Sequence, residues 1–338
     1  MKINQSHRRA AIRLAVACAA SLVGAASMPG LAWAQAAGNY PSRPIRLIVG
    51  YSAGGPTDVL ARLLAKEMAT NLGTSVVVEN KPGANGYIAT EYVQRAAPDG
   101  YTILMNTISH NVNPLIKPHL IHYDPIKDFT QIAQVAVLPQ LLVVGGHSPY
   151  ETLKQLLDKA KKQPGQVSFG SAGVGGSAHL AAALLEERSG TKMNHIPFQG
   201  NGPALTDVIA GRVDFMFYPM VGLKDFVASG KLRILAATTA KRLPDYPKVP
   251  TMSELGFPGF EDYAQPIGFV GPANIPAAVT AKLAKSVKTA LDKPEVQERL
   301  KTLGAEIKYR DSADYRQWLG QDRQRWADLI KKADIHAE

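Results

Sequence analysis

Two glycine-rich loops, each between a short apolar run and a helical pattern, are the residues of this chain best suited to chemistry. The first loop spans 50–58 and reads GYSAGGPTD, and the second spans 170–177 and reads GSAGVGGS. A strand, a glycine loop and a helix in this order leave free backbone N–H groups at the positive end of the helix dipole. Such a place favours an anion. The sequence therefore predicts two anion-binding loops that could face each other across a cleft.

A dinucleotide site is the first alternative for these loops. Glu79 ends a predicted strand where a ribose-binding acid would stand, but Gly54-Gly55-Pro56 lacks the G-x-G-x-x-G spacing. The second loop comes nearer to that spacing, yet the strand after it ends in Pro197-Phe198 and offers no acid. We therefore expect no nucleotide cofactor, and no cofactor of another kind.

A serine hydrolase is the second alternative. The run GGSAH at 175–179 approaches the G-x-S-x-G motif but lacks its final glycine. A histidine two residues after a serine at a helix start cannot easily turn back to act as its base. We therefore interpret Ser177 as the N-cap of its helix.

A metal site is the third alternative. His110, His119 and His122 lie within 13 residues, but their spacing fits neither a helical pair nor a zinc motif. We expect no metal. His179, in the first turn of the second helix, and His110, in the loop after a predicted strand, are candidates either for ligand contact or for a structural role.

The first 34 residues predict a cleavable export signal. Basic residues precede an apolar segment over 14–26 that is too short for a membrane span, and Ala32-Trp33-Ala34 offers a cleavage site. Arg8-Arg9 matches a twin-arginine signal only loosely, which favours Sec export over Tat. In a Gram-negative cell, these features predict a periplasmic protein.

The composition after residue 34 excludes several classes of protein. The single cysteine, Cys18, lies inside the signal, which leaves no disulfide framework and no thiol nucleophile. The signal carries four of the 38 basic residues and none of the 28 acidic ones, so the net charge falls from +10 to +6. The basic residues lie mostly at helical spacing, as on solvated helix faces, which disfavours a nucleic-acid surface.

Short apolar runs alternate with amphipathic helical patterns, which is typical of an α/β protein with parallel strands. The length favours two domains, and the proline-broken segments 135–144 and 263–270 are candidate crossovers between them. The apolar stripe of the last helix, which includes Trp318 and Trp326, is interpreted as core. The expected strands are 45–49, 76–79, 101–105, 141–144, 167–169, 195–198, 214–218, 232–238 and 267–270, and the expected helices are 59–72 with Pro56 in its first turn, 178–187, one opened by Pro203, 277–291, 294–303 and 313–333.

Several motifs in order resemble the Bug family, the periplasmic substrate-binding proteins of tripartite tricarboxylate transporters. They are YPSRPIRLIV at 40–49, AGGPTD at 53–58, VVVENKPGA at 76–84 and PDGYT at 98–102. The resemblance continues through 123–129, 170–179, 195–200 and 211–214, and it covers essentially the whole mature chain.

The resemblance implies a type II periplasmic-binding-protein fold, in which two α/β domains joined by crossover strands close around a ligand cleft. It implies a receptor without enzymatic activity that delivers a small carboxylate to the membrane permease subunits of a transporter. A di- or tricarboxylate, an acidic amino acid or an aromatic acid would each fit the family. The expected domains are 35–138 with 266–338, and 139–265, after the signal peptide 1–34.

The resemblance also implies which residues contact the ligand. Because an acid repels a carboxylate, Asp58 is expected to order water or to cap its helix. Tyr51, the segment 106–110 and Tyr218-Pro219-Met220 depart from the usual family pattern, so the identity of the acid does not carry over. The expected ligand-binding residues are Tyr51, Ser52, Ala53, Gly54, Gly55, Thr57 and Asp58 on one wall, Ser171, Ala172, Gly173, Ser177 and His179 on the other, and Thr107, Ser109, His110, Phe198, Gln199, Gly200 and Asn201 around the remaining pocket.

Two functions stay open beside transport. One is an exported hydrolase of small esters that uses Ser177. The other is a receptor that reports ligand occupancy to a membrane signalling protein.

Overall fold

Two β-sheets covered by helices make up the part of the chain that the computed structural model describes, residues 39–332 and 335. The predicted signal peptide and its cleavage site lie outside the described residues. Among the helices of the described part, none combines the length and the apolar character needed to cross a bilayer.

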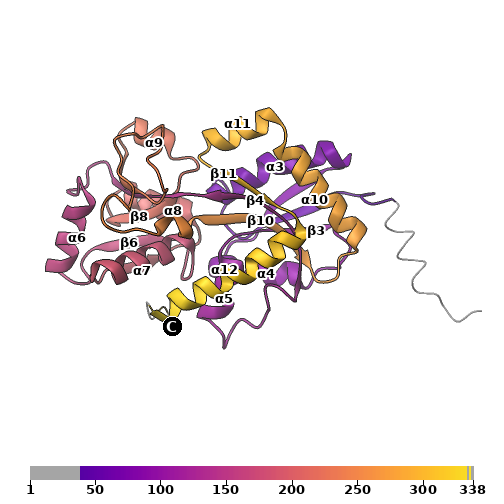
Figure 1. Cartoon of the computed structure of the whole chain (residues 1–338), viewed down its shortest axis with the longest axis horizontal. Coiled ribbons are helices and arrows are strands. Elements are labelled where there is room, and N and C mark those ends of the chain that lie inside the picture. The colour runs from indigo at the N-terminus through magenta and orange to yellow at the C-terminus, as the bar shows by residue number, and fades with distance from the viewer. Residues whose placement is uncertain (1–38, 333–334, 336–338) are drawn as a thin grey trace, which may run out of the picture. The chain divides into compact units, whose positions relative to one another are not determined.

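The first sheet has the strand order β11-β4-β10-β3-β1-β2. Strand β1 (Ile45–Val49) pairs in parallel with both β2 (Val76–Asn80) and β3 (Thr102–Asn106). Strand β10 (Gln265–Pro272) runs antiparallel to β3 and to β4 (Phe129–Leu138), and β11 (Glu306–Arg310) runs antiparallel to β4. Figure 1 shows β4 and β10 side by side.

The second sheet has the strand order β7-β6-β8-β5-β9. Strand β6 (Ser168–Ser171) pairs in parallel with β7 (Asn194–Pro197) and β8 (Phe215–Pro219). Strand β5 (Gln140–Gly145) runs antiparallel to β8 and to β9 (Leu232–Ala237). The expectation of parallel strands is therefore wrong for part of each sheet, because the strands that connect the sheets enter them against the direction of their neighbours.

The chain passes from the first sheet to the second at Pro139, which separates β4 from β5. Proline has no N–H group to donate to a strand ladder, so a strand is readily interrupted at this residue. The chain returns to the first sheet at β10, after the short 3-10 helix η2 (Phe260–Tyr263). Both crossover segments lie where the sequence predicted them.

The helices mostly follow their predicted positions. Helix α3 (Pro56–Leu72) ends at Gly73, which takes the left-handed conformation expected of a C-terminal glycine. Helix α12 (Ser312–Lys332) packs on β4 and on α5 (Ser109–Ile116), as Figure 1 shows. The remaining helices are α4 (Tyr87–Gln94) after the 3-10 turn η1 (Ala84–Gly86), α5 (Ser109–Ile116), α6 (Leu153–Lys162), α7 (Ser177–Ser189), α8 (Asn201–Ile209), α9 (Lys224–Ala228), α10 (Ala277–Leu291), α11 (Pro294–Thr302) and α12 (Ser312–Lys332).

Several elements differ from the prediction, and helices α4, α6 and α9 were not among the expected helices. The expected loop over 107–111 is mostly helix α5, whose signal is hidden by its polar first turn and by Pro114. Strand β11 was not predicted, because its sequence EIKYR alternates and it borders the sheet at an edge. The stripe of α12 is core as predicted, since Trp326 is fully buried together with Leu329 and Ile330.

Candidate functional site

The two glycine loops deliver the N-termini of α3 and α7 to one place. Gly55 precedes α3 in an extended conformation with Pro56 as the first helical residue, and Gly176 precedes α7 in the same conformation. No side chain within the described part of the chain caps either helix. The first-turn N–H groups of a helix have no intrahelical acceptor, so both ends offer donors to a ligand.

Both helix N-termini border one narrow cavity of about 20 Å³, which we call the small cavity. This volume holds about one water molecule. Eight of its lining residues were predicted to contact ligand, and they come from both loops and from the segments near 107 and 201. The small cavity is lined by Tyr51, Ser52, Gly55, Pro56, Thr57, Thr107, Ile108, Ala172, Gly176, Ser177, Asn201 and Gln265.

Tyr51 connects the first loop to the start of α5. Its hydroxyl lies 2.9 Å from the hydroxyl oxygens of both Thr107 and Ser109, and it donates to Asn85 Oδ1 at 3.4 Å. Burial raises the pKa of Tyr51, so the side chain stays neutral. The predicted residue Ser109 thus acts through Tyr51, because it does not itself line the small cavity.

Asp58 holds the first loop in shape. Its carboxylate accepts hydrogen bonds of 2.9 Å from the Gly54 N–H, from Arg62 Nε and from Asn80 Nδ2. Burial alone would raise the pKa of Asp58, but these donors and the charge of Arg62 lower it below its ordinary value. The carboxylate therefore stays ionised while it faces the loop backbone.

The structure does not place Ala53, Gly54 or Asp58 on the lining of the small cavity, and their contact with a ligand stays a prediction. Ala53 and Gly54 are exposed and do not line the small cavity, and the Gly54 N–H is already bonded to Asp58. The residues of the first loop that line the small cavity are Tyr51, Ser52, Gly55, Pro56 and Thr57. A sequence motif shows which residues form a loop, but not which of them face inward.

Two histidines, His179 and His195, contact the second loop and stabilise it. Ser171 Oγ lies 2.6 Å from His195 Nε2 and 3.1 Å from both the N and the O of Gly173. His179 Nδ1 accepts the Gly175 N–H at 3.0 Å, and the rings of His179 and His195 stack at 4.1 Å. Burial, with a contribution from His195, lowers the pKa of His179 to about 3, and burial lowers the pKa of His195 to about 4.

The side chains of Ser171 and His179 therefore support the loop, and the predicted contact of these two residues with a ligand stays a prediction. Ser171 Oγ and His179 Nδ1 are bonded to the loop backbone or to His195, and neither residue lines the small cavity. Between them, Ala172, Gly176 and Ser177 border the small cavity.

His110 is a core residue, so its predicted ligand contact is wrong. It is 1% exposed, its ring stacks on Tyr123 at 5.6 Å, and it meets the edge of Phe129 at 4.6 Å. Its Nε2 donates to the Pro125 carbonyl at 3.1 Å, and burial lowers its pKa to about 4.

Residues 39–332 and 335 contain no group of three or more His, Cys, Asp or Glu that could hold a metal ion.

Ser177 is the first residue of α7 and not its N-cap, which corrects the prediction. Its hydroxyl donates to Gln265 Oε1 at 2.8 Å, and Gln265 Nε2 donates to Thr57 Oγ1 at 3.4 Å. Gln265 thus joins the first turns of α3 and α7 through the returning strand β10. Since the hydroxyl is bonded to an amide and His179 is bonded to Gly175, this geometry does not support Ser177 as a nucleophile.

Two further hydrogen bonds join residues attached to the first sheet with residues attached to the second. Ser52 Oγ donates to the Gln199 carbonyl at 3.2 Å, and a Cβ on Gly200 would lie 3.2 Å from Ser52 Oγ. Asn85 Nδ2 donates to the Val174 carbonyl at 2.9 Å, and a Cβ on Gly173 would lie 3.3 Å from Asn85 Cβ. The close fit explains why glycine stands at 173 and 200.

Asn85 was missed by the sequence analysis. It takes a left-handed conformation with φ 52°. Its Nδ2 donates to Asn113 Oδ1 at 3.0 Å, and Asn113 Nδ2 donates to the Asn85 backbone carbonyl at 3.1 Å. The run Gly83-Ala84-Asn85-Gly86 signals a turn, but nothing local in it indicates a contact 89 residues away. Gln265 was missed for the same reason, although a polar residue inside a predicted crossover was a possible signal.

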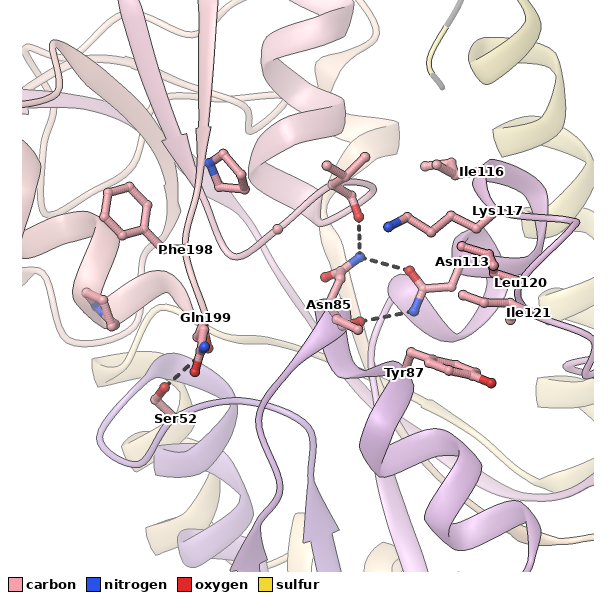
Figure 2. Close-up of a pocket in the computed structure, with 15 residues that line it drawn as sticks. Ser52, Asn85, Tyr87, Asn113, Ile116, Lys117, Leu120, Ile121, Phe198 and Gln199 are labelled. Carbon is pink, nitrogen blue, oxygen red and sulfur yellow. Dashed lines mark hydrogen bonds between the residues drawn. The ribbon is translucent and has the colours of Figure 1, made fainter. Parts of the chain in front are cut away.

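A second cavity, of about 800 Å³, opens beyond these two hydrogen bonds, and we call it the large cavity. Ser52 lines both cavities, and Figure 2 shows the Ser52–Gln199 and Asn85–Val174 bonds together with the residues around the large one. The large cavity is lined by Ser52, Ala84, Asn85, Tyr87, Asn113, Ile116, Lys117, Leu120, Ile121, Gly173, Val174, Pro197, Phe198, Gln199 and Pro203.

Comparisons with known proteins show the family and the fold of this chain. The model of the tripartite tricarboxylate transporter family receptor, TctC, matches residues 60–335. The structure of the periplasmic binding protein BugD is 37% identical and covers 88% of this chain and 100% of its own, with a TM-score of 0.83. MatC from Rhodopseudomonas palustris with bound malate is 31% identical and covers 86% of this chain and 100% of its own, with a TM-score of 0.81. An R. palustris protein solved with adipate is 31% identical and covers 88% of this chain and 99% of its own, with a TM-score of 0.84.

Proposed function

Because this chain belongs to the tripartite tricarboxylate transporter receptor family, we propose that it captures a small organic carboxylate between the N-termini of α3 and α7. It is a solute-binding protein of the TctC and Bug type, and that family is a receptor family rather than an enzyme family. Its fold is the α/β fold of periplasmic binding proteins, as the sequence predicted.

The convergence of two uncapped helix N-termini on one cavity is the observation that carries this proposal. Each helix end favours a carboxylate by about 0.3–1 kcal/mol through its dipole. Hydrogen bonds from free N–H groups to a charged acceptor contribute about 1.5–3 kcal/mol each. The residues that line the two cavities, all within the described part of the chain, include no acid that would repel the ligand. Malate and adipate, both dicarboxylates, accompany two of the similar structures.

Ligand entry requires the cleft to open, since the small cavity holds only about one water molecule. Opening would break the Ser52–Gln199 and Asn85–Val174 hydrogen bonds and would bend the chain at Pro139 and near Gln265. The moving bodies in this proposal are the predicted domains, 35–138 with 266–338, and 139–265. The origin of the strands supports this division, because β5 to β9 all come from 140–237 and form one sheet.

The proposed route begins with export through the N-terminal signal, by Sec, into the periplasm. The loaded receptor then delivers its carboxylate to the membrane permease subunits of a tripartite transporter. The description of the matching family supports this partner.

Substitution of Thr57 by Asp tests the proposed anion site. Thr57 is buried in the first turn of α3 and lines the small cavity, so Thr57→Asp places a carboxylate where the ligand's carboxylate would bind. Thr57→Asn has nearly the same shape without the charge and serves as the matched control. An acid in the first turn is compatible with the helix dipole, so the fold is expected to persist.

The readout is calorimetric titration with malate, adipate and a panel of other carboxylates. We expect Thr57→Asp to weaken the acid that the wild type binds by at least about a hundredfold and Thr57→Asn to weaken it by about tenfold or less. Equal affinity of the two variants would contradict the proposal, as would a wild-type protein that binds no carboxylate in the panel.

A further inference from the structure

The large cavity carries one charged side chain among the described residues that line it, that of Lys117. Lys117 ends helix α5, and its N–H donates to the Asn113 carbonyl at 3.0 Å. Its own carbonyl accepts from the N–H groups of Leu120 and Ile121 at 3.0 and 2.9 Å, which fixes the turn that follows the helix. The base of the lysine is therefore held firmly by the backbone.

The side chain of Lys117 is directed toward Asn85, which is bonded to Val174. Figure 2 shows it extending toward the hydrogen bonds that Asn85 makes with Val174 and Asn113. A cation at the C-terminal end of a helix is favoured by the helix dipole alone. The dipole does not account for the direction of this side chain toward the hydrogen bonds of Asn85.

The wall around Lys117 is mainly apolar. Ile116, Leu120, Ile121 and Phe198 contribute hydrocarbon surface, and Leu120 is 66% exposed, an unusual position for a leucine. The Tyr87 hydroxyl donates a hydrogen bond to Glu91 at 2.9 Å. Because Glu91 does not line the large cavity, this hydroxyl is bonded to a residue outside the cavity wall. A cavity with apolar walls and one cation matches a ligand segment that is apolar and ends in an anion.

We infer that the large cavity is a distal subsite and that Lys117 binds a second carboxylate of the ligand there. The first carboxylate lies at the N-termini of α3 and α7, and an apolar segment of several methylene groups or a ring joins the two across Asn85. This inference rests on the proposed function and specifies the class of acid, an elongated dicarboxylate. The same subsite disfavours an acid whose distal end is cationic.

Matched pairs of acids test this inference. Adipate and hexanoate have the same number of carbon atoms, as do pimelate and heptanoate, and within each pair only the diacid has a second carboxylate. By calorimetry, the wild type is expected to bind each diacid at least about tenfold more tightly than its monoacid, a difference of about 1.4 kcal/mol. Lys117→Met, which keeps the length but not the charge, is expected to weaken the diacids about tenfold and to change the monoacids less than about twofold.

Two other variants keep the test decisive. Lys285→Met removes one positive charge from an exposed position on α10 and is expected to leave all affinities unchanged. Leu120→Asp adds a carboxylate at an exposed position on the cavity wall, where it does not endanger the fold, and is expected to weaken the diacids more than the monoacids.

The possible failures are distinguishable. If Lys117→Met and Leu120→Asp bind every diacid as the wild type does, while Thr57→Asp still abolishes binding, the distal subsite is contradicted and the proposed function stands. If the wild type prefers monoacids, the subsite is likewise contradicted. If no acid binds to the wild type, the proposed function fails and the subsite fails with it.

Discussion

The two glycine loops resemble each other in sequence, but a charged side chain fixes the first and neutral side chains fix the second. The first loop is fixed by the ionised carboxylate of Asp58, which binds the Gly54 N–H together with Arg62 and Asn80. The second is fixed by neutral imidazoles, since His179 accepts the Gly175 N–H and His195 bonds Ser171. The comparison teaches that two loops of similar sequence can depend on side chains in two different protonation states.

Acid should therefore loosen the two loops in different pH ranges. The folded pKa values of His179 and His195 lie at about 3 and 4, below the ordinary value of 6.5, so the unfolded chain takes up protons first. Their stabilising effect is present above about pH 6.5 and is lost as the pH falls toward 4. Asp58 has a folded pKa below its ordinary 3.8, so its contribution is lost only as the pH falls below that value.

Removal of the Asp58 carboxylate is expected to have the largest effect on this comparison. Asp58→Ala leaves the Gly54 N–H and the Asn80 amide without their charged acceptor, and we expect a loss of about 3 kcal/mol in urea unfolding at pH 7. Asp158→Ala is the control, because Asp158 forms an exposed pair with Lys154 and its removal should change the stability little. Similar losses for both variants would contradict the role of Asp58 in the first loop.

The pH dependence of stability is expected to show the next effect. Between pH 7 and 5, a histidine with such a lowered pKa reduces the free energy of unfolding by about 2 kcal/mol. His195→Phe keeps an aromatic ring against Phe169 and His179 but cannot titrate, so it should remove about that much of the wild-type decline. His147→Phe, at an exposed histidine, should keep the wild-type decline. Identical pH profiles for the two variants would show that the His195 imidazole does not support the fold.

A matched pair of glycines gives a smaller effect. Gly54 and Gly175 have nearly the same φ, +79° and +78°, but a Cβ on Gly54 meets nothing within 4 Å, whereas one on Gly175 would lie 2.6 Å from Ile116 Cδ1. Gly54→Ala should cost about 1 kcal/mol from backbone strain, and Gly175→Ala about 1 kcal/mol more from the clash with α5. Thermal or urea unfolding measures the difference, and equal costs would mean that the second loop does not pack as tightly as described.

The sequence predicted most of what is local in this structure. Glycine spacing, proline positions and apolar periodicity placed both loops, both crossovers and the helix 277–291 at or near their observed bounds. The same information could not separate Tyr51, Ser52, Gly55 and Thr57, which face the small cavity, from Ala53 and Gly54, which do not. Loop direction depends on the Asp58 network, and that network forms only in the folded chain.

The misses share a physical cause, since each depends on contacts between distant parts of the chain. His110 has the sequence surroundings of a loop histidine, and only its packing on Tyr123 and Phe129 makes it a core residue. Asn85 and Gln265 act through partners 89 and 208 residues away, in Val174 and Thr57. Periodicity and local motifs carry no information on such pairs.

Backbone amide chemical shifts test the central claim most directly, the claim that both helix N-termini bind one carboxylate. In a titration of the ¹⁵N-labelled protein with the acid that binds best, the N–H signals of Thr57 and Asp58 in α3 and of Ala178 and His179 in α7 should shift together. They should follow one binding curve with the same Kd. Shifts confined to one of the two helices, or two curves with different Kd values, would contradict the account.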